Sequence, residues 1–210
     1  MTSQFAPSWR AWPLLAALTL VACSSAEKAE AALETAYSNF GPANTYGNFG
    51  QTIGGTFVNG YQFTSTAAGS ITEINVGIGG SGTFNLALYS DNSNVLGTSL
   101  WSTSNVPVGT GSPNPAQINV VAGPSLELGE AYWLVASGPT ASAFWSPNTT
   151  SASGRWYHQD SNGSFYLNNT NLGAISVTVL AVPEPGAIFL FILAAAATYG
   201  RCFRHGCRRS

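Results

Sequence analysis

The central part of the chain consists of short segments in which apolar and polar residues alternate, separated by turns rich in glycine, asparagine, serine and proline. In residues 72–78, for example, Ile74, Val76 and Ile78 share one face, and residues 84–89 repeat the pattern. A period of two places alternate side chains on the same face of a β-strand. About ten such segments occur without helical periodicity between them, so we expect an all-β domain, a jelly-roll-like antiparallel β-sandwich.

A central strand and a hairpin are also expected in this region. Residues 131–136 are apolar on both faces, which is typical of a strand that is covered on each side. Asn59-Gly60 lies between two short β-prone runs, and this pair favours tight hairpin turns because both residues adopt positive φ readily. We therefore expect residues 56–64 to form a hairpin.

Charge is scarce in this domain, which limits the partners that it can bind. Charged residues form only 8% of the chain, whereas an average soluble protein has roughly 25%. Between residues 37 and 181 one cation stands against five carboxylates: Arg155, and Glu73, Asp91, Glu127, Glu130 and Asp160. Without a basic patch, nucleic acid is not an expected partner. All three cysteines lie outside this region, so we expect no disulfide in the domain.

The N-terminal segment has the pattern of a secretory signal peptide. Arg10 precedes an apolar run at 14–22, which is shorter than the ~20 residues that a membrane-spanning helix needs. We therefore expect residues 1–31 to be a signal peptide. Leu20-Val21-Ala22-Cys23 also looks like a bacterial lipobox, in which the cysteine is lipidated and becomes the new N-terminus. Lipidation of Cys23 is the alternative to ordinary cleavage.

The C-terminal segment, residues 182–210, has three parts in order. The motif Pro183-Glu184-Pro185 is followed by an apolar run at 187–197 and by a basic tail with four arginines: Arg201, Arg204, Arg208 and Arg209. The prolines restrict φ and disfavour a helix, so the motif should be extended and accessible. A helix over 186–199 would be about 21 Å long, short of a hydrocarbon core of about 30 Å. We expect a short transmembrane helix that acts as a temporary anchor, with its arginines in the cytoplasm.

This arrangement resembles the PEP-CTERM sorting signal of exported bacterial proteins. The resemblance implies that Pro183, Glu184 and Pro185 form a sorting and processing motif for an exosortase, a membrane protease-transpeptidase. This partner is thought to cut near the motif and to pass the protein to the envelope or the extracellular matrix. The alternative is a permanent tail-anchoring helix that is not processed.

Three patterns in the body point to a class of surface domains. They are the Phe57…Phe63 segment, residues 86–91 before a polar turn, and residues 132–135 followed by Trp145 and Trp156. These patterns resemble the choice-of-anchor class, in which bacterial β-domains are joined to differing C-terminal anchors. The resemblance implies an extracytoplasmic domain, here residues 32–181, without an established activity. We therefore expect an exported structural protein at the cell surface or in the extracellular matrix.

We expect no catalytic residue, metal ligand or cofactor site in the body. Its only histidine is His158, and the nucleophile motif G-x-S-x-G is missing. The five carboxylates have no spacing that suggests a glycosidase. Residues 91–94 (Asp-Asn-Ser-Asn) lack the spaced carboxylates of a calcium loop, so we expect a polar turn there.

Aromatic residues are the best candidates for ligand binding. Trp133 lies within an apolar run and is expected in the core. Trp145 and Trp156 lie nearer to polar segments, and together with Tyr157 they could stack on sugar rings. The alternative function is therefore a carbohydrate-binding module with an extracellular polysaccharide as partner.

Overall fold

The structure of the protein is a computed structural model. It describes residues 31–139, 142–160, 162 and 164–181, of which Ala32–Ala181 belong to one compact unit. The expected signal peptide with Cys23 and the C-terminal segment at 182–210 lie outside the described residues. Within the part that is described, no helix is long and apolar enough to cross a membrane.

The described residues form an all-β domain in which every strand pairing is antiparallel. The strands are β1 (Ala32–Ser38), β2 (Gln51–Ile53), β3 (Val58–Thr64), β4 (Gly69–Val76), β5 (Ile78–Gly80), β6 (Thr83–Asn92), β7 (Val95–Pro107), β8 (Ala116–Asn119), β9 (Ser125–Leu126), β10 (Ala131–Ser137), β11 (Ala143–Trp145), β12 (Ser153–Gln159), β13 (Phe165–Asn171) and β14 (Ile175–Ala181). A short 3₁₀ turn, η2 (Pro42–Asn44), follows β1.

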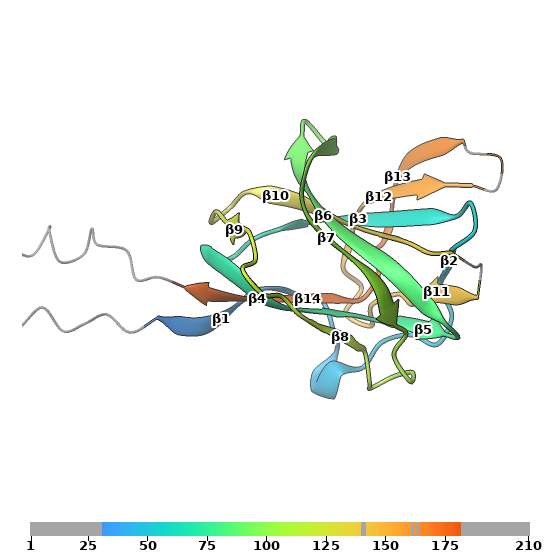
Figure 1. Cartoon of the computed structure of the whole chain (residues 1–210), viewed down its shortest axis with the longest axis horizontal. Helices are drawn as coiled ribbons and strands as arrows, with labels where there is room; N and C mark the ends of the chain where they lie inside the picture. Colours follow the sequence, from blue (N-terminus) through green and yellow to red (C-terminus); the bar gives the residue numbers. More distant parts are fainter. Residues whose placement is uncertain (1–30, 140–141, 161, 163, 182–210) are drawn as a thin grey trace, which may run out of the picture. The chain divides into compact units, whose positions relative to one another are not determined.

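The strands are arranged in three sheets (Figure 1). The five-stranded sheet has the order β1-β14-β4-β8, and β9 also pairs with β4. The six-stranded sheet has the order β13-β12-β3-β10-β6-β7, and the three-stranded sheet has the order β2-β11-β5. Side chains from all three sheets pack into one hydrophobic core, which makes the domain β-sandwich-like.

The alternation seen in the sequence decides which side chains reach this core. Ile74 and Val76 of β4 are fully buried, as are Phe84, Leu86 and Leu88 of β6, while the residues that alternate with them are only half-buried. The expected inward faces of these strands are therefore confirmed. Each large apolar side chain buried in this way contributes roughly 1.5–3 kcal/mol to folding.

The expectation for residues 131–136 is also confirmed. Strand β10 pairs with β3 on one side and with β6 on the other, so it is a central strand of the six-stranded sheet. Its residues from Tyr132 to Ala136 are all buried, whichever face they occupy. Both faces of this strand are thus covered.

The expected hairpin at Asn59-Gly60 is wrong, because both residues lie inside strand β3. The turn lies earlier, where Gly54 and Phe57 exchange two backbone hydrogen bonds. Gly60 is needed for space and not for a turn, since a Cβ there would approach Val135 Cγ2 to 2.9 Å. Asn59 is fully buried. Tertiary packing here overrides a local turn preference.

Both ends of the domain lie at the same end of the sandwich. Ala32, the first residue of β1, is paired with Ala181, the last residue of β14. The opposite end of β14 begins at Ile175, and the preceding Gly173 forms a β-bridge with Pro147, just after β11. We call the end at Ala32 and Ala181 the proximal end, and the end with the three-stranded sheet the distal end (Figure 1).

Candidate functional site

The three aromatic residues that were expected to bind carbohydrate are not brought together. Trp145 is fully buried, with its ring edge-on against Tyr61 at a centroid distance of 4.9 Å and its Nε1 donating to the Ala174 carbonyl at 3.1 Å. The alternation of β11 turns Ala143 and Trp145 inward and Phe144 outward. Trp145 has no exposed ring face for a ligand, which corrects the expectation for this residue.

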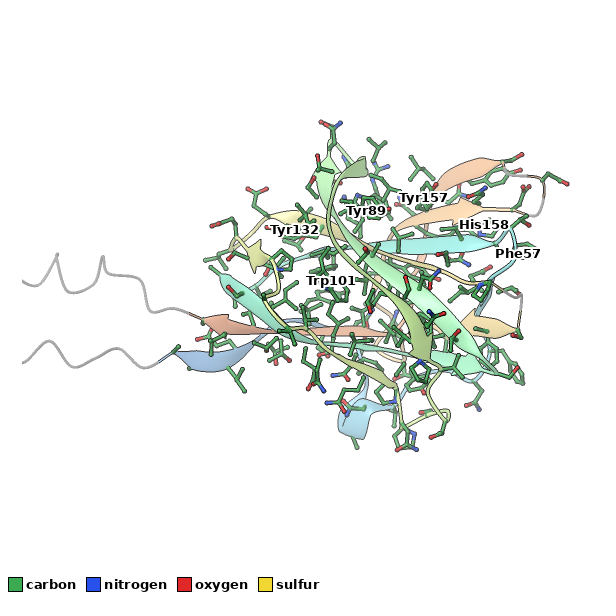
Figure 2. The ribbon with its side chains drawn as sticks, in the orientation of Figure 1. Phe57, Tyr89, Trp101, Tyr132, Tyr157 and His158 are labelled. Carbon is green, nitrogen blue, oxygen red and sulfur yellow. The ribbon has the colours of Figure 1, made fainter. Side chains whose placement is uncertain are left out.

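Trp156 and Tyr157 follow one another in β12, so they lie on opposite faces of the six-stranded sheet. Trp156 is opposite Tyr61 of β3 and shares its face, whereas Tyr157 is opposite Gly60 on the outer face. Tyr157 lies close to Tyr89 of β6 on this outer face, as Figure 2 shows. A single flat ligand cannot therefore contact Trp156 and Tyr157 together.

Trp156 instead belongs to a group of rings at the edge of the six-stranded sheet, which we call the aromatic edge: Phe57, Trp156, His158 and Tyr166. His158 is the centre of this group. Its ring lies 4.7 Å from that of Trp156, 6.4 Å from that of Phe57 and 6.2 Å from that of Tyr166, with interplanar angles of 24–26°. Trp156 and His158 are two residues apart on β12, and Tyr166 on the neighbouring strand β13 is paired with His158. Phe57 and His158 lie together at one end of the sheet in Figure 2.

Hydrogen bonds to the buried Asn59 hold the aromatic edge in place. Its Oδ1 accepts a hydrogen bond from Trp156 Nε1 and lies 2.9 Å from His158 Nδ1, while its Nδ2 donates to the Thr52 carbonyl at 2.6 Å. An indole N–H can only donate, so the amide atom that faces it must be the oxygen. His158 Nδ1 faces the same oxygen and must therefore carry a proton. The neutral ring then has its lone pair on Nε2.

The electrostatics of the aromatic edge favour a neutral histidine. Burial lowers the pKa of His158 below its ordinary value of 6.5, while the negative charge of Asp160 acts in the opposite direction. The pKa of Asp160 is itself lowered, first by the backbone N–H of Ser164, which outweighs the small effect of burial. The hydroxyl of Tyr166 also donates to this carboxylate, at 3.2 Å. His158 is thus uncharged at neutral pH.

Part of this group of rings is open to solvent and could contact a neutral ligand. Trp156 and His158 are half-buried and Tyr166 is 45% exposed. An aromatic face carries partial negative charge and attracts the polarised C–H groups of a sugar ring. Among the residues that the structure describes, no group of three or more His, Cys, Asp or Glu side chains could hold a metal ion.

The chain matches no protein-family model and no curated protein.

Asp91 has a structural role at the polar turn that the sequence predicts. Its Oδ2 accepts the backbone N–H of Asn94 at 2.9 Å, and its Oδ1 accepts Trp133 Nε1 and Gln62 Nε2, both at 2.7 Å. Burial raises the pKa of this carboxyl, but these three hydrogen bonds and the charge of Arg155 together lower it. The turn is therefore tied to the outer face of the six-stranded sheet by its carboxylate.

Sequence reasoning missed most of the aromatic edge. The spacing of Trp156 and His158 shows that they share a face, so their contact could have been anticipated. Phe57, Asn59 and Tyr166 join them only through the pairing of β3, β12 and β13, which local sequence does not reveal. The motif Pro183-Glu184-Pro185, the basic tail and Cys23 lie beyond the described residues.

Proposed function

We propose that this chain is an exported bacterial protein that is displayed as a jelly-roll-like β-sandwich at the cell envelope surface or in the extracellular matrix. Its C-terminal segment is a PEP-CTERM sorting signal, which an exosortase recognises at Pro183-Glu184-Pro185. The apolar run after the motif serves as a transient membrane anchor, and the four arginines of the tail remain in the cytoplasm. The displayed domain has a structural role.

The pairing of Ala32 with Ala181 is the observation that carries this proposal. Both chain ends leave the domain at its proximal end, so a tether there leaves the distal end free to face the surroundings. Only Val182 separates β14 from Pro183. A short connection of this kind suits a domain that is held close to its anchor until the anchor is removed.

Mass spectrometry of the mature protein from a host that contains an exosortase tests this proposal. The expected product lacks the residues that follow the motif, and its N-terminus lies near residue 31. The variant Glu184→Ala should keep the complete C-terminus, whereas Glu127→Ala, an exposed carboxylate in the domain, should be processed normally. A wild-type protein that ends at Ser210 would contradict the proposal, and acylation at Cys23 would identify a lipobox instead of an ordinary cleavage site.

The aromatic edge favours a second function, the binding of an extracellular polysaccharide. Near-parallel rings held by a buried asparagine form a pre-organised surface for stacking, which lowers the cost of ordering on binding. A glycan array with the mature protein tests this function. Trp156→Ala should abolish binding, while Leu167→Ala, an exposed residue on the opposite face of β13, should not.

A further inference from the structure

The distal end of the sandwich carries an exposed phenylalanine that the aromatic edge does not include. Phe49 lies in the loop before β2 and is 85% exposed. Its ring lies 6.2 Å from that of Phe144, with an interplanar angle of 31°. Phe144 is the outward residue of β11 and is paired with Gly79 of β5. The two rings therefore form a pair on the surface of the three-stranded sheet, which we call the distal phenylalanine pair.

Backbone contacts hold this pair in place. The loop of Phe49 is attached to the segment after β11 by a hydrogen bond from the Gly47 N–H to the Pro147 carbonyl, at 2.9 Å. Gly50 lies directly on the backbone of Trp145, where any Cβ would collide with the carbonyl oxygen. Phe144 lies over Gly79, where a Cβ would be 3.4 Å from the ring. The pair is thus fixed by the chain beneath it and not by burial of Phe49.

A depression lies on each side of the pair. The first has a volume of about 200 Å³ and is lined by Phe144. The second has a volume of about 330 Å³ and is lined by Phe49. The two depressions share no lining residue, but the contact between Phe49 and Phe144 places a ring from each next to the other, so an extended ligand that crosses the pair could contact both. Ligand sites commonly occupy about 300–1,000 Å³, so the second depression alone reaches the lower end of this range and the first falls below it.

The lining of both depressions is polar but uncharged. Thr110 and Ser112 contribute hydroxyls to the first, and Gln51 and Asn171 contribute amides to the second. Neither depression is lined by an Asp, Glu, Lys or Arg side chain. An ionised ligand would therefore lose hydration without gaining a counter-charge, whereas a neutral ligand with hydroxyl groups could pair with both donors and acceptors.

A buried hydroxyl in the same region lacks a partner. Ser146 lines the smaller depression, and its Oγ is the buried side-chain polar atom without a hydrogen-bond partner among the described residues. Buried polar groups are nearly always paired with protein, water or ligand. Ser146 is fully buried in the free domain, so a hydroxyl group bound in the depression would supply such a partner once the wall of the depression shifts to uncover the Oγ.

We propose that the distal phenylalanine pair and its two depressions bind a neutral polysaccharide. Sugar rings stack on Phe49 and Phe144 through their C–H faces, and their hydroxyls pair with the uncharged groups on each side. The site lies at the distal end, away from the chain exits at Ala32 and Ala181, so a proximal tether leaves it accessible (Figure 1). The proposal depends neither on the sorting signal nor on the aromatic edge.

The experiment is a titration of the mature protein, by calorimetry, with cellohexaose, laminarihexaose and mannohexaose as neutral probes and hexagalacturonate as the acidic probe. We expect binding of at least one neutral probe and none of the acidic one. Phe49→Ala should weaken binding at least tenfold, which corresponds to about 1.4 kcal/mol. The melting temperature should not change, since Phe49 is exposed. Val121→Ala, which removes a residue that is 89% exposed elsewhere on the surface, is the matched control and should bind normally.

A second variant tests the polar part of the site. Ser146→Ala should weaken binding of the neutral probe without lowering the melting temperature, because it removes a hydroxyl that has no partner in the free domain. If Ser146→Ala instead lowers the melting temperature and leaves affinity unchanged, that hydroxyl has a structural role and takes no part in binding.

Three outcomes would overturn the proposal. The first is the absence of binding to all three neutral probes. The second is binding that survives Phe49→Ala but is lost on Trp156→Ala, which would assign polysaccharide to the aromatic edge instead. The third is a dimer in analytical ultracentrifugation that dissociates on Phe49→Ala without any probe binding, which would identify the pair as a contact between two copies of the chain.

Discussion

Replacing Asn59 by alanine is expected to destabilise the domain although no apolar side chain is removed. Asn59 is fully buried and connects three partners: Trp156 Nε1, His158 Nδ1 and the Thr52 carbonyl. Each hydrogen bond of this kind contributes about 1 kcal/mol net to stability. Trp156 and His158 are only half-buried, so water can satisfy part of what is lost. We therefore expect a loss of about 2–3 kcal/mol.

Thermal unfolding of the mature protein measures this loss. For a domain of this size, 1 kcal/mol corresponds to about 2–4 °C, so Asn59→Ala should lower the melting temperature by roughly 4–12 °C. Asn169→Ala is the matched control, because Asn169 is exposed on β13 of the same sheet. Its change should stay within about 0.5 kcal/mol.

Asn59→Asp provides a second readout that a general loss of packing would not produce. An aspartate there keeps an oxygen toward His158 Nδ1 but adds a negative charge, so the pKa of His158 should rise. NMR of the histidine ring should also show the neutral wild-type ring protonated at Nδ1. The reasoning is refuted if Asn59→Ala has the melting temperature of the wild type, or if the pKa of His158 is the same in the wild type and in Asn59→Asp.

Three further predictions concern the core and the titrating groups. Trp145→Ala should lower the free energy of unfolding in urea by about 3–5 kcal/mol, because the ring is fully buried and its Nε1 donates a hydrogen bond to the Ala174 carbonyl. An unchanged urea midpoint would show that Trp145 is not in the core. The pKa of His158 in the folded domain lies below 6.5, its ordinary value, so between these two pKa values the unfolded chain binds more protons than the folded one. The free energy of unfolding should therefore fall as the pH is lowered through this window. His158→Gln should make this fall smaller, as measured by urea unfolding at pH 5–7. Asp91→Asn should cost about 1 kcal/mol at pH 7, since one oxygen cannot accept from three donors. The pKa of Asp91 is lowered in the folded domain, so the ionised carboxylate stabilises the fold above pH 3.8, and this stabilisation is lost as the pH falls through the folded-state pKa. The unfolding free energies of the wild type and the variant should therefore become equal in acid. A difference that stays constant with pH would contradict this.

The distribution of aromatic residues explains why the binding surfaces were difficult to anticipate. Phe49 stands in a segment with little periodicity, and nothing in its neighbours indicates that it remains exposed. Phe144 and Trp145 are adjacent, and the short strand β11 decides that the tryptophan is buried and the phenylalanine faces outward. Which of two neighbouring aromatic residues reaches the core depends on what covers each face of the strand.

The sequence alone determined the fold class and the inward faces of the long strands. The period of two in β4, β6 and β14 is a property of the extended backbone, so residues such as Ile74, Leu88 and Val177 are assigned to the core without knowledge of their partners. The order of motif, apolar run and arginines in the C-terminal segment is likewise visible only as sequence, and the sorting function proposed from it remains a prediction.

The tertiary structure decided how the polar and aromatic residues are used. Asn59-Gly60 has the local preference of a turn, but the pairing of β3 with β10 and β12 keeps it extended, because Gly60 leaves room for Val135 and Asn59 finds three partners. The pairing of β1 with β14 at the proximal end joins residues that are about 150 positions apart in the sequence. The entropic cost of closing so long a loop is modest, because it grows only slowly with loop length. Local sequence carries no signal for such contacts, and they decide which surface the domain presents.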